Sequence, residues 1–490
     1  MKIKTCICFL LALVLSFSLF SQEPSFNKET QQVALVAKIL KNSTTAKMQQ
    51  VWPGYNLRAK PVFITFGNGH IYAFNMKNMD GEWKHTNIDG VEVLYTNKDR
   101  WGITNAPMQF NFEINGQEAF VFRIDMMPEP AFLPFFVLVH ERFHVYQMQY
   151  FDSEQNFDEE SEYPESENPK NLALMQIEEK ILLDFMNALK DNLKEEALIH
   201  LKTFIAINKE RRKLLSKSSI VWEGRQQMVE GLADYAAAKN LDVFAYFGEK
   251  VGQKHIIHTM EGYTKDNDIT ARALKWRHYG IGASLGYALD FLHVANWKKD
   301  VERNVSLQIQ LENNLKVVQH EGESLMHQAF EKYNYLKLQT EVKEQIDTYN
   351  NMLNSHMEGF KRLPGMVVNI QTPPDSGLSA GGHSKGVYSL SDGSMFSHLD
   401  TSKTSSADNR WILELRSMPY LFQTNDGFRR FKVNAQDLEL LVDGKPCSLN
   451  NLREKNFHKL MIQGQSCKFQ STQNPGTVTM RDGELSITYR

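Results

Sequence analysis

Short runs of alternating apolar and polar residues mark the first part of the chain. Between residues 61 and 125 they read PVFITF, HIYAF, VEVLYT, MQFNFEI and AFVFRID, and Gly, Asn and Asp residues separate them. Alternation with a period of two predicts half-buried strands, and the separating residues predict turns. A helical pattern over residues 31–50 precedes these runs. We therefore expect a helix followed by an antiparallel sheet.

The spacing of apolar residues becomes helical after the turn signal at residues 126–131. The first helix is expected over residues 132–150, and an acidic stretch over residues 152–169, typical of a solvated loop, follows it. Further helical patterns cover residues 170–190, 194–215, 220–239, 276–295 and 321–362. A large helical region is therefore predicted for the middle of the chain.

Beyond Pro364 and Gly365 the pattern returns to short strand-like runs such as MVVNI, RWILELR, LELLV, KLMIQ and LSITYR. Residues 371–409 are rich in Ser, Gly, Asp and Thr, which predicts a long loop or a set of turns. We expect an α+β protein with a leader at 1–21, a strand-rich region at 22–130, a helical region at 131–363 and a β-rich module at 364–490.

The beginning of the chain has the pattern of a secretory signal peptide. Lys2 and Lys4 precede an apolar run over residues 6–20, and a polar stretch follows from Ser21. The run is shorter than the ~20 residues that a membrane span needs. We expect cleavage after Ser21 and an exported protein, periplasmic or secreted, without a membrane span.

Composition narrows the possible partners. Lys and Arg total 55 against 58 Asp and Glu, and because the basic residues form no patch, nucleic acid is not an expected partner. Removal of the leader leaves two cysteines, Cys447 and Cys467, which either pair or remain as thiols. Two cysteines are too few for a main zinc centre built from thiolates.

Residues 140–144 read His-Glu-Arg-Phe-His, an H-E-x-x-H pattern inside the predicted helix at 132–150. Residues four apart share one face of a helix, so His140 and His144 can reach a single ion, with Glu141 beside it. The flanks are strongly apolar, and burying these polar groups would be costly unless a metal or hydrogen bonds satisfied them. The pattern predicts a metal site, and the alternative is a set of polar core residues satisfied by their neighbours.

A third ligand is expected from the helical stretch at 220–239. There Glu230, Gly231, Ala233 and Tyr235 form the pattern E-G-x-A-x-Y, and Glu230 and Asp234 form E-x-x-x-D. Together with the first motif, these patterns resemble the gluzincins, the zinc hydrolases that include thermolysin, which has the second pattern, and the aminopeptidases related to aminopeptidase N, which have the first. The gap from the first motif is longer than is typical of these families, and no G-x-M-E-N segment occurs.

This resemblance implies a zincin-like catalytic core that holds Zn2+ with His140, His144 and Glu230. It further implies that Glu141 acts as general base and that Asp234 holds a ligand histidine by its free ring N–H. The implied substrate is a peptide or protein, bound along the AFVFRID run as an edge strand. Glu223, and less strongly Glu178 and Glu179, compete with Glu230 for the third position.

Two other functions remain open. One is an exported binding protein with a structural zinc site, and the other is a zinc hydrolase that acts on non-peptide esters or amides. Outside the two motifs, His278 and Tyr279 precede a run of small residues, GIGASLG, which would allow close helix approach. Either side chain is a candidate for oxyanion stabilisation or for simple aromatic packing. His255 and His258 are expected on the surface.

Overall fold

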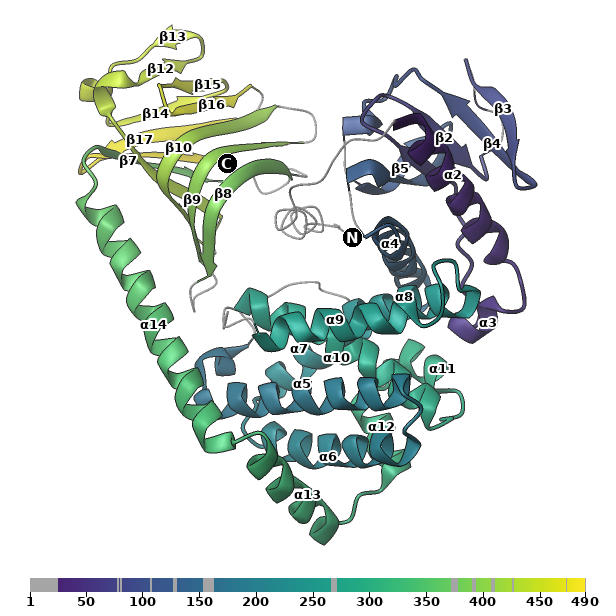
Figure 1. The fold of residues 1–490 in the computed structure, drawn as a ribbon. Coiled ribbons are helices and arrows are strands. Elements are labelled where there is room, and N and C mark those ends of the chain that lie inside the picture. Colours follow the sequence, from purple (N-terminus) through teal and green to yellow (C-terminus); the bar gives the residue numbers. More distant parts are fainter. Residues whose placement is uncertain are drawn as a thin grey trace.

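The computed structural model describes residues 25–489 except 77–78, 80–81, 106–107, 127–129, 153–162, 266–270, 372–377, 390–393, 407–409, 425–426 and 473. The predicted leader at 1–21 lies outside the described residues. The fold is mixed α+β, as expected: a small sheet and a large curled sheet stand on the same side of a helical base, one over each end of it (Figure 1). In the part of the chain that is described, no helix is long and apolar enough to cross a membrane.

The N-terminal part combines helices with a six-stranded sheet of order β3-β4-β2-β1-β6-β5. Its helices are α2 (Ser25–Asn42), α3 (Met48–Val51), η1 (Ile103–Asn105) and η2 (Ile124–Met126). Its strands are β1 (Val62–Thr65), β2 (Ile71–Phe74), β3 (Lys84–Ile88), β4 (Val91–Thr96), β5 (Met108–Ile114) and β6 (Gln117–Arg123). The pairs are antiparallel as predicted, apart from β1 and β6, which are parallel.

The predicted edge strand is wrong. The AFVFRID run forms most of β6, which lies between β1 and β5, so β5 stands at that edge of the sheet instead. Proximity in sequence to the following helix does not reveal strand order, because β6 returns to pair in parallel with the distant β1. Phe120 of β6 faces the helical side, where its ring lies 5.6 Å from the guanidinium carbon of Arg142.

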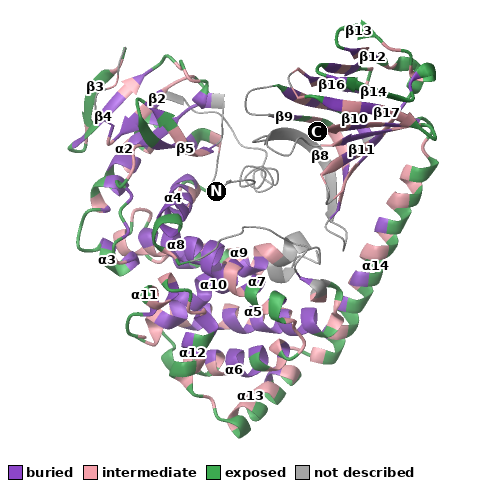
Figure 2. Cartoon of the chain, turned by 180° about the vertical axis from the view of Figure 1, so that it is seen from behind, coloured by how far each residue is buried: buried purple, intermediate pink, exposed green. Residues whose placement is uncertain are grey.

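The helical part shares one large apolar core with the N-terminal part. Its elements are α4 (Leu133–Tyr150), η4 (Pro164–Glu167), α5 (Pro169–Lys190), α6 (Lys194–Arg212), α7 (Lys217–Gln226), η5 (Gln227–Gly231), α8 (Leu232–Phe244), α9 (Val251–Lys265), α10 (Ala271–Phe291), α11 (Trp297–Glu302), α12 (Leu307–Leu315), α13 (Gln319–Lys332) and α14 (Tyr335–Arg362). Figure 2 shows that buried residues gather on α4, α8 and α10, whereas α13 and α14 are largely exposed or intermediate.

Two details of the helical prediction are corrected. The single helix expected over residues 321–362 is broken into α13 and α14 at Asn334, whose φ of 51° is left-handed. The pattern over residues 251–265, not predicted as helical, forms α9.

The C-terminal part has a separate apolar core and a twelve-stranded sheet. Its elements are β7 (Met366–Gln371), β8 (Leu378–Ser389), β9 (Met395–Ser406), β10 (Trp411–Gln423), β11 (Phe428–Val433), η6 (Ala435–Asp437), β12 (Glu439–Val442), β13 (Lys445–Pro446), η7 (Leu449–Asn451), β14 (Glu454–Phe457), β15 (Leu460–Gln463), β16 (Cys467–Ser471), β17 (Gly476–Arg481) and β18 (Glu484–Tyr489). Helix α14 ends two residues before Pro364, so the element type changes at the expected boundary. Cys447 and Cys467 are free thiols.

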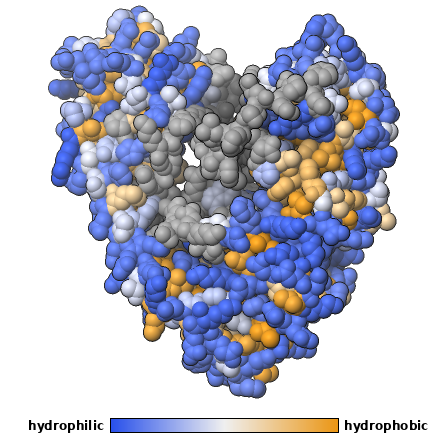
Figure 3. All heavy atoms as spheres, in the orientation of Figure 1, coloured by the Kyte–Doolittle hydropathy of each residue, from blue (hydrophilic) through white to orange (hydrophobic). Residues whose placement is uncertain are grey.

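The long loop predicted over residues 371–409 is also wrong. Most of that segment forms β8 and β9, two long antiparallel strands, and β9 pairs in turn with β10. Ser- and Thr-rich segments lack an apolar signal, but backbone pairing with an existing strand can still order them. Figure 3 shows a mostly hydrophilic face, with hydrophobic residues gathered on the side that carries the N-terminal part and in smaller groups over the helical base.

Candidate metal centre

Helix α4 crosses the middle of the core. Its apolar residues, with Pro134 in the first turn, favour a helix that is buried on nearly every side, and residues 139–147 are buried without exception. His140, Glu141 and His144 lie within this segment, where they are 8%, 7% and 5% exposed. Their ligand atoms lie within 4.8 Å of one another, so this buried group can hold a metal ion.

Glu230 reaches the same place from a second helix. Helices α7 and α8 follow each other without a break, and between them the chain forms one π-helical turn, η5. A π turn inserts an extra residue into the helix and shifts the direction of its side chains. Glu230 lies in this turn and is 4% exposed, and the packing of α8 on α4 directs it toward the two histidines.

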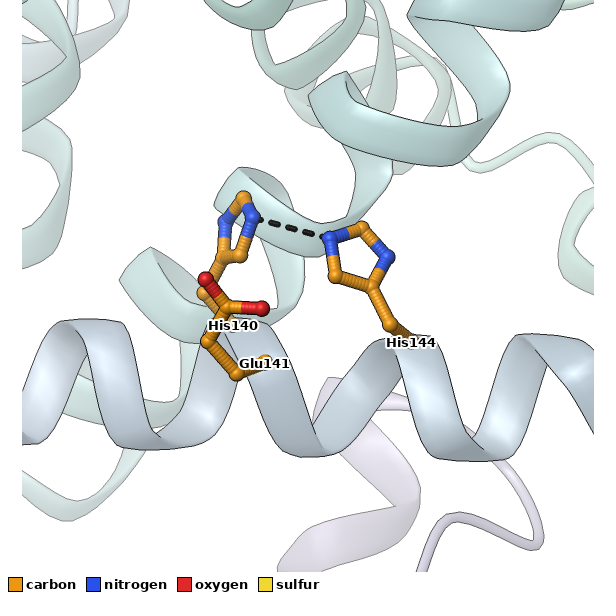
Figure 4. Close-up of side chains that lie close together, drawn as sticks. All are labelled: His140, Glu141 and His144. Carbon is orange, nitrogen blue, oxygen red and sulfur yellow. Dashed lines mark hydrogen bonds between the residues drawn. The ribbon is translucent and has the colours of Figure 1, made fainter. Parts of the chain in front are cut away.

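Three side-chain atoms converge between the two helices. The Nε2 atoms of His140 and His144 are 3.0 Å apart, and both rings point toward the same space above α4 (Figure 4). Oε2 of Glu230 lies 3.5 Å from Nε2 of His140 and 3.3 Å from Nε2 of His144. Two ligands at the tetrahedral positions of zinc, about 2.0–2.1 Å from the ion, would be about 3.3 Å apart. The three atoms therefore have the mutual spacing of one face of a tetrahedral site.

The hydrogen-bond partner of each Nδ1 atom decides which nitrogen of the neutral ring carries the proton. Nδ1 of His140 lies 2.7 Å from Oδ1 of Asp234, and Nδ1 of His144 lies 2.7 Å from Oε1 of Gln147. A carboxylate only accepts, and the amide nitrogen of Gln147 already donates to two carbonyls, so both Nδ1 atoms are donors. In the neutral rings both Nε2 atoms are then acceptors.

Two imidazole lone pairs and a carboxylate oxygen thus face one another, and a positive charge must separate them. Without a metal ion, a proton on a ring nitrogen meets this demand, and the directions of the pKa shifts reflect that protonated state. Burial lowers the pKa of His140, but hydrogen bonds to Asp234 and Glu230 raise it well above its usual range. Burial raises the pKa of Glu230, but the charge of His144 and hydrogen bonds from both rings hold it well below its usual range. A divalent cation satisfies all three acceptors at once.

Glu141 follows the first histidine and belongs to the same buried group. Its Oε2 atom is buried and has no hydrogen-bond partner. Burial raises the pKa of Glu141, and the charges of His140 and His144 oppose that change. A buried, unpartnered carboxylate oxygen beside the converging acceptors is placed to accept a proton from a group bound there.

The competing carboxylates are engaged elsewhere. Both oxygens of Glu223 accept from the guanidinium of Arg211 at 2.6 Å. Glu178 forms an ion pair with Arg211 at 2.9 Å, and Glu179 pairs with Arg277. The structure therefore brings Glu230 to the two histidines and keeps the other three glutamates in a separate buried charge network.

Of the two candidates for oxyanion stabilisation, Tyr279 contacts the site and His278 does not. The ring of Tyr279 stacks on His140, with centroids 6.0 Å apart and an interplanar angle of 7°. His278 points instead toward Trp222 and Gln227, away from the candidate site. His258 is exposed as expected, but His255 is not a free surface residue, because its ring packs 4.5 Å from that of Phe136.

The run of small residues brings α10 directly against η5, as the sequence predicted. Gly282 meets Gly231 and the backbone of Gln227 so closely that a Cβ atom there would lie 2.8 Å from Cα of Gly231. The sequence did not reveal the part played by Gln147, because a lone glutamine three residues beyond the motif has no distinguishing pattern.

Comparison of the whole chain with known proteins found no matching family model, no matching curated protein and no matching solved structure.

Proposed function

We propose that this chain is an exported zinc-dependent hydrolase with a zincin-like core, and that it acts as a metallopeptidase. The observation that carries the proposal is the convergence of three acceptors, His140 Nε2, His144 Nε2 and Glu230 Oε2, at distances of 3.0–3.5 Å. Two neutral nitrogens and one carboxylate oxygen form a ligand set that suits zinc and leaves one position open for water or substrate. The identity of the metal rests on this chemistry.

The residues around this set have separate tasks in the proposed reaction. Zinc held by His140, His144 and Glu230 would supply Lewis-acid chemistry, lowering the pKa of a bound water toward ~7 and polarising a carbonyl group. Glu141 takes the proton from the attacking water and returns it to the leaving amine. Asp234 keeps Nε2 of His140 free of a proton, because it accepts the hydrogen bond from Nδ1. The stacked ring of Tyr279 limits rotation of His140.

The proposed peptide substrate binds along β5. This strand stands at one end of the order of the six-stranded sheet, next to β6. Backbone groups of an edge strand can pair with an extended peptide. The presence of Glu141 favours an enzyme over a structural metal site, since a structural site has no need of a general base.

Export is the second part of the proposal. It rests on the basic, apolar and then polar order of the first residues, with cleavage after Ser21. Expression of the whole chain, followed by fractionation and N-terminal sequencing of the mature protein, tests it. A mature form that starts at Met1 and stays in the cytoplasm would remove the export assignment and leave the metal site untouched.

The function is tested by metal analysis and digestion of the purified mature chain. We expect about one zinc per chain, and we expect a peptide library to be cleaved in a reaction that a chelator stops and added zinc restores. A chain that contains no metal and takes none up would overturn the proposal. Metal with hydrolysis of esters or other amides, and no peptide cleavage, would replace the substrate class; metal without any hydrolysis would indicate a structural site.

A further inference from the structure

Gln147 connects the two halves of the candidate metal centre. It lies on α4, three residues after His144, and is 1% exposed. Its Oε1 atom accepts the hydrogen bond from Nδ1 of His144 at 2.7 Å. Its Nε2 atom donates to the carbonyl oxygens of Met228 and Val229, both at 2.9 Å. One amide group therefore contacts both His144 on α4 and the backbone of η5 immediately before Glu230.

The backbone that Gln147 contacts is the π turn η5. A π turn replaces part of the regular pairing between residues four apart, and the amide of Leu232 here bonds to the oxygens of Gln227 and Val229. Buried carbonyl oxygens near such a turn need donors, and the side-chain amide of Gln147 supplies two. The contact thus stabilises the turn that directs Glu230 toward the histidines.

The geometry also fixes the orientation of the amide. Turning the group over would place Oε1 against two carbonyl oxygens and leave Nδ1 of His144 facing a donor, so only one orientation satisfies all three contacts. The π turn therefore determines that Oε1 faces His144, and His144 is held with Nε2 toward Glu230. The orientation of one histidine and the position of the glutamate are set by the same side chain.

The opposite side of η5 is held by a different set of contacts. The side chain of Gln227 contacts Nδ1 of His278 at 3.2 Å and accepts a hydrogen bond from Gln308. Gly282 of α10 packs directly on the turn. The turn is therefore clamped between α10 and α4, and Gln147 provides the contact on the α4 side.

We infer that Gln147 is a positioning residue that couples His144 to Glu230 and so sets the affinity of the site for its metal. The inference rests on the proposed zinc site. It assigns no contact between Gln147 and the metal or substrate, and it predicts that loss of the amide moves Glu230 and frees His144 together.

Two substitutions separate the two contacts of the amide. Gln147→Leu removes both, and the zinc affinity of the full mature chain, measured by competition with a chelator, is expected to fall about 10–100-fold. Gln147→Glu can still accept from His144 but directs oxygen toward the two carbonyls. Because the link to η5 is lost, we expect its zinc affinity to fall at least about tenfold as well. Visible absorption of Co2+ in place of zinc, which reports coordination geometry, is expected to change in both variants.

Gln253→Leu is the matched control. Gln253 is also buried, and its amide nitrogen donates to the carbonyl oxygen of Met186 at 3.2 Å, away from the metal site. This control is expected to lose comparable thermal stability while its zinc affinity and Co2+ spectrum stay those of the parent. A general effect of removing a buried amide is thereby separated from an effect on the site.

The outcomes that would overturn the inference are specific. Parent-like zinc affinity in Gln147→Leu would show that the amide does not position the ligands. Reduced affinity in Gln147→Leu with parent-like affinity in Gln147→Glu would show that it orients His144 alone, without coupling to Glu230. If the leucine variant does not fold, the isosteric glutamate variant decides. Failure of the parent itself to bind zinc would overturn the proposed function and is distinct from these results.

Discussion

Oδ1 of Asp234 accepts a hydrogen bond from Nδ1 of His140 at 2.7 Å, although 94 positions separate the two residues in the chain. The contact joins α8 to α4 and places Nε2 of His140 opposite Glu230, four residues before Asp234. One helix thereby supplies both the carboxylate that faces the two histidines and the carboxylate that orients one of them. The geometry of the candidate metal centre therefore depends on the packing of these two helices.

Replacement of Asp234 tests this dependence. Asp234→Asn keeps an acceptor for His140 but removes the negative charge, so the ring becomes a weaker ligand, and we expect zinc affinity to fall about tenfold or more. Chelator competition measures it. Asp242→Asn, which changes a carboxylate that accepts backbone hydrogen bonds from Gly252 and Gln253, is the control and should bind zinc like the parent. Equal affinity in Asp234→Asn and the parent would contradict the assigned role.

Glu141→Gln tests the proposed general base. The change preserves size and leaves the three converging acceptors in place, so metal content should equal that of the parent. Because the amide cannot accept the proton of the attacking water, turnover should fall by about 10²–10⁴-fold. Hydrolysis at the parental rate by a metal-loaded variant would remove Glu141 from the mechanism.

Gly282→Ala tests the contact between α10 and the π turn. The added methyl group meets backbone atoms of Gln227 and Gly231, which cannot turn aside as a side chain could. We expect a loss of about 1–3 kcal/mol in the free energy of unfolding, measured by denaturant titration. Gly224→Ala, on α7 of the continuous helix against which Gly282 packs, has open space at its Cβ position and should be neutral or slightly stabilising. Equal stability of the two variants would show that the close approach is not needed.

The buried charge network predicts a pH dependence of stability. Burial raises the pKa of Glu178 from 4.5 to about 7, and Arg211 opposes this only in part because it also pairs with Glu223. The folded chain therefore holds a proton on Glu178 that the unfolded chain has released. This contribution to stability is complete below the pKa that Glu178 has in the unfolded chain, and it is lost as the pH rises through about 7, the pKa of Glu178 in the folded chain.

Glu178→Gln measures the size of that contribution. The neutral amide has no charged form, so the free energy of unfolding should fall less in the variant than in the parent between about pH 5 and about pH 8. The difference between the two falls should be up to about 3 kcal/mol. Glu249→Gln, at an exposed position, should keep the parental slope. A parental slope in Glu178→Gln as well would mean that Glu178 does not take up the buried proton.

Local patterns in the sequence determined much of the candidate site. The spacing of His140 and His144 places both rings on one face of α4, and the same spacing relates Glu230 to Asp234 on the second helix. Apolar flanks predicted the burial of α4, and small residues predicted the close approach of α10. These features follow from helix geometry and residue size, which act over a few residues and can therefore be read from the chain alone.

Tertiary structure decided what depends on contacts between distant segments. Arg211 engages Glu223, which left Glu230 as the carboxylate that meets the histidines. Parallel pairing of β1 with β6 made β5 the edge of the sheet, and pairing of β9 with β10 ordered a segment that lacks an apolar signal. Gln147 acquires its part only where a π turn presents two carbonyl oxygens to it. Such outcomes depend on contacts between segments that are distant in the chain, and local periodicity does not predict those contacts.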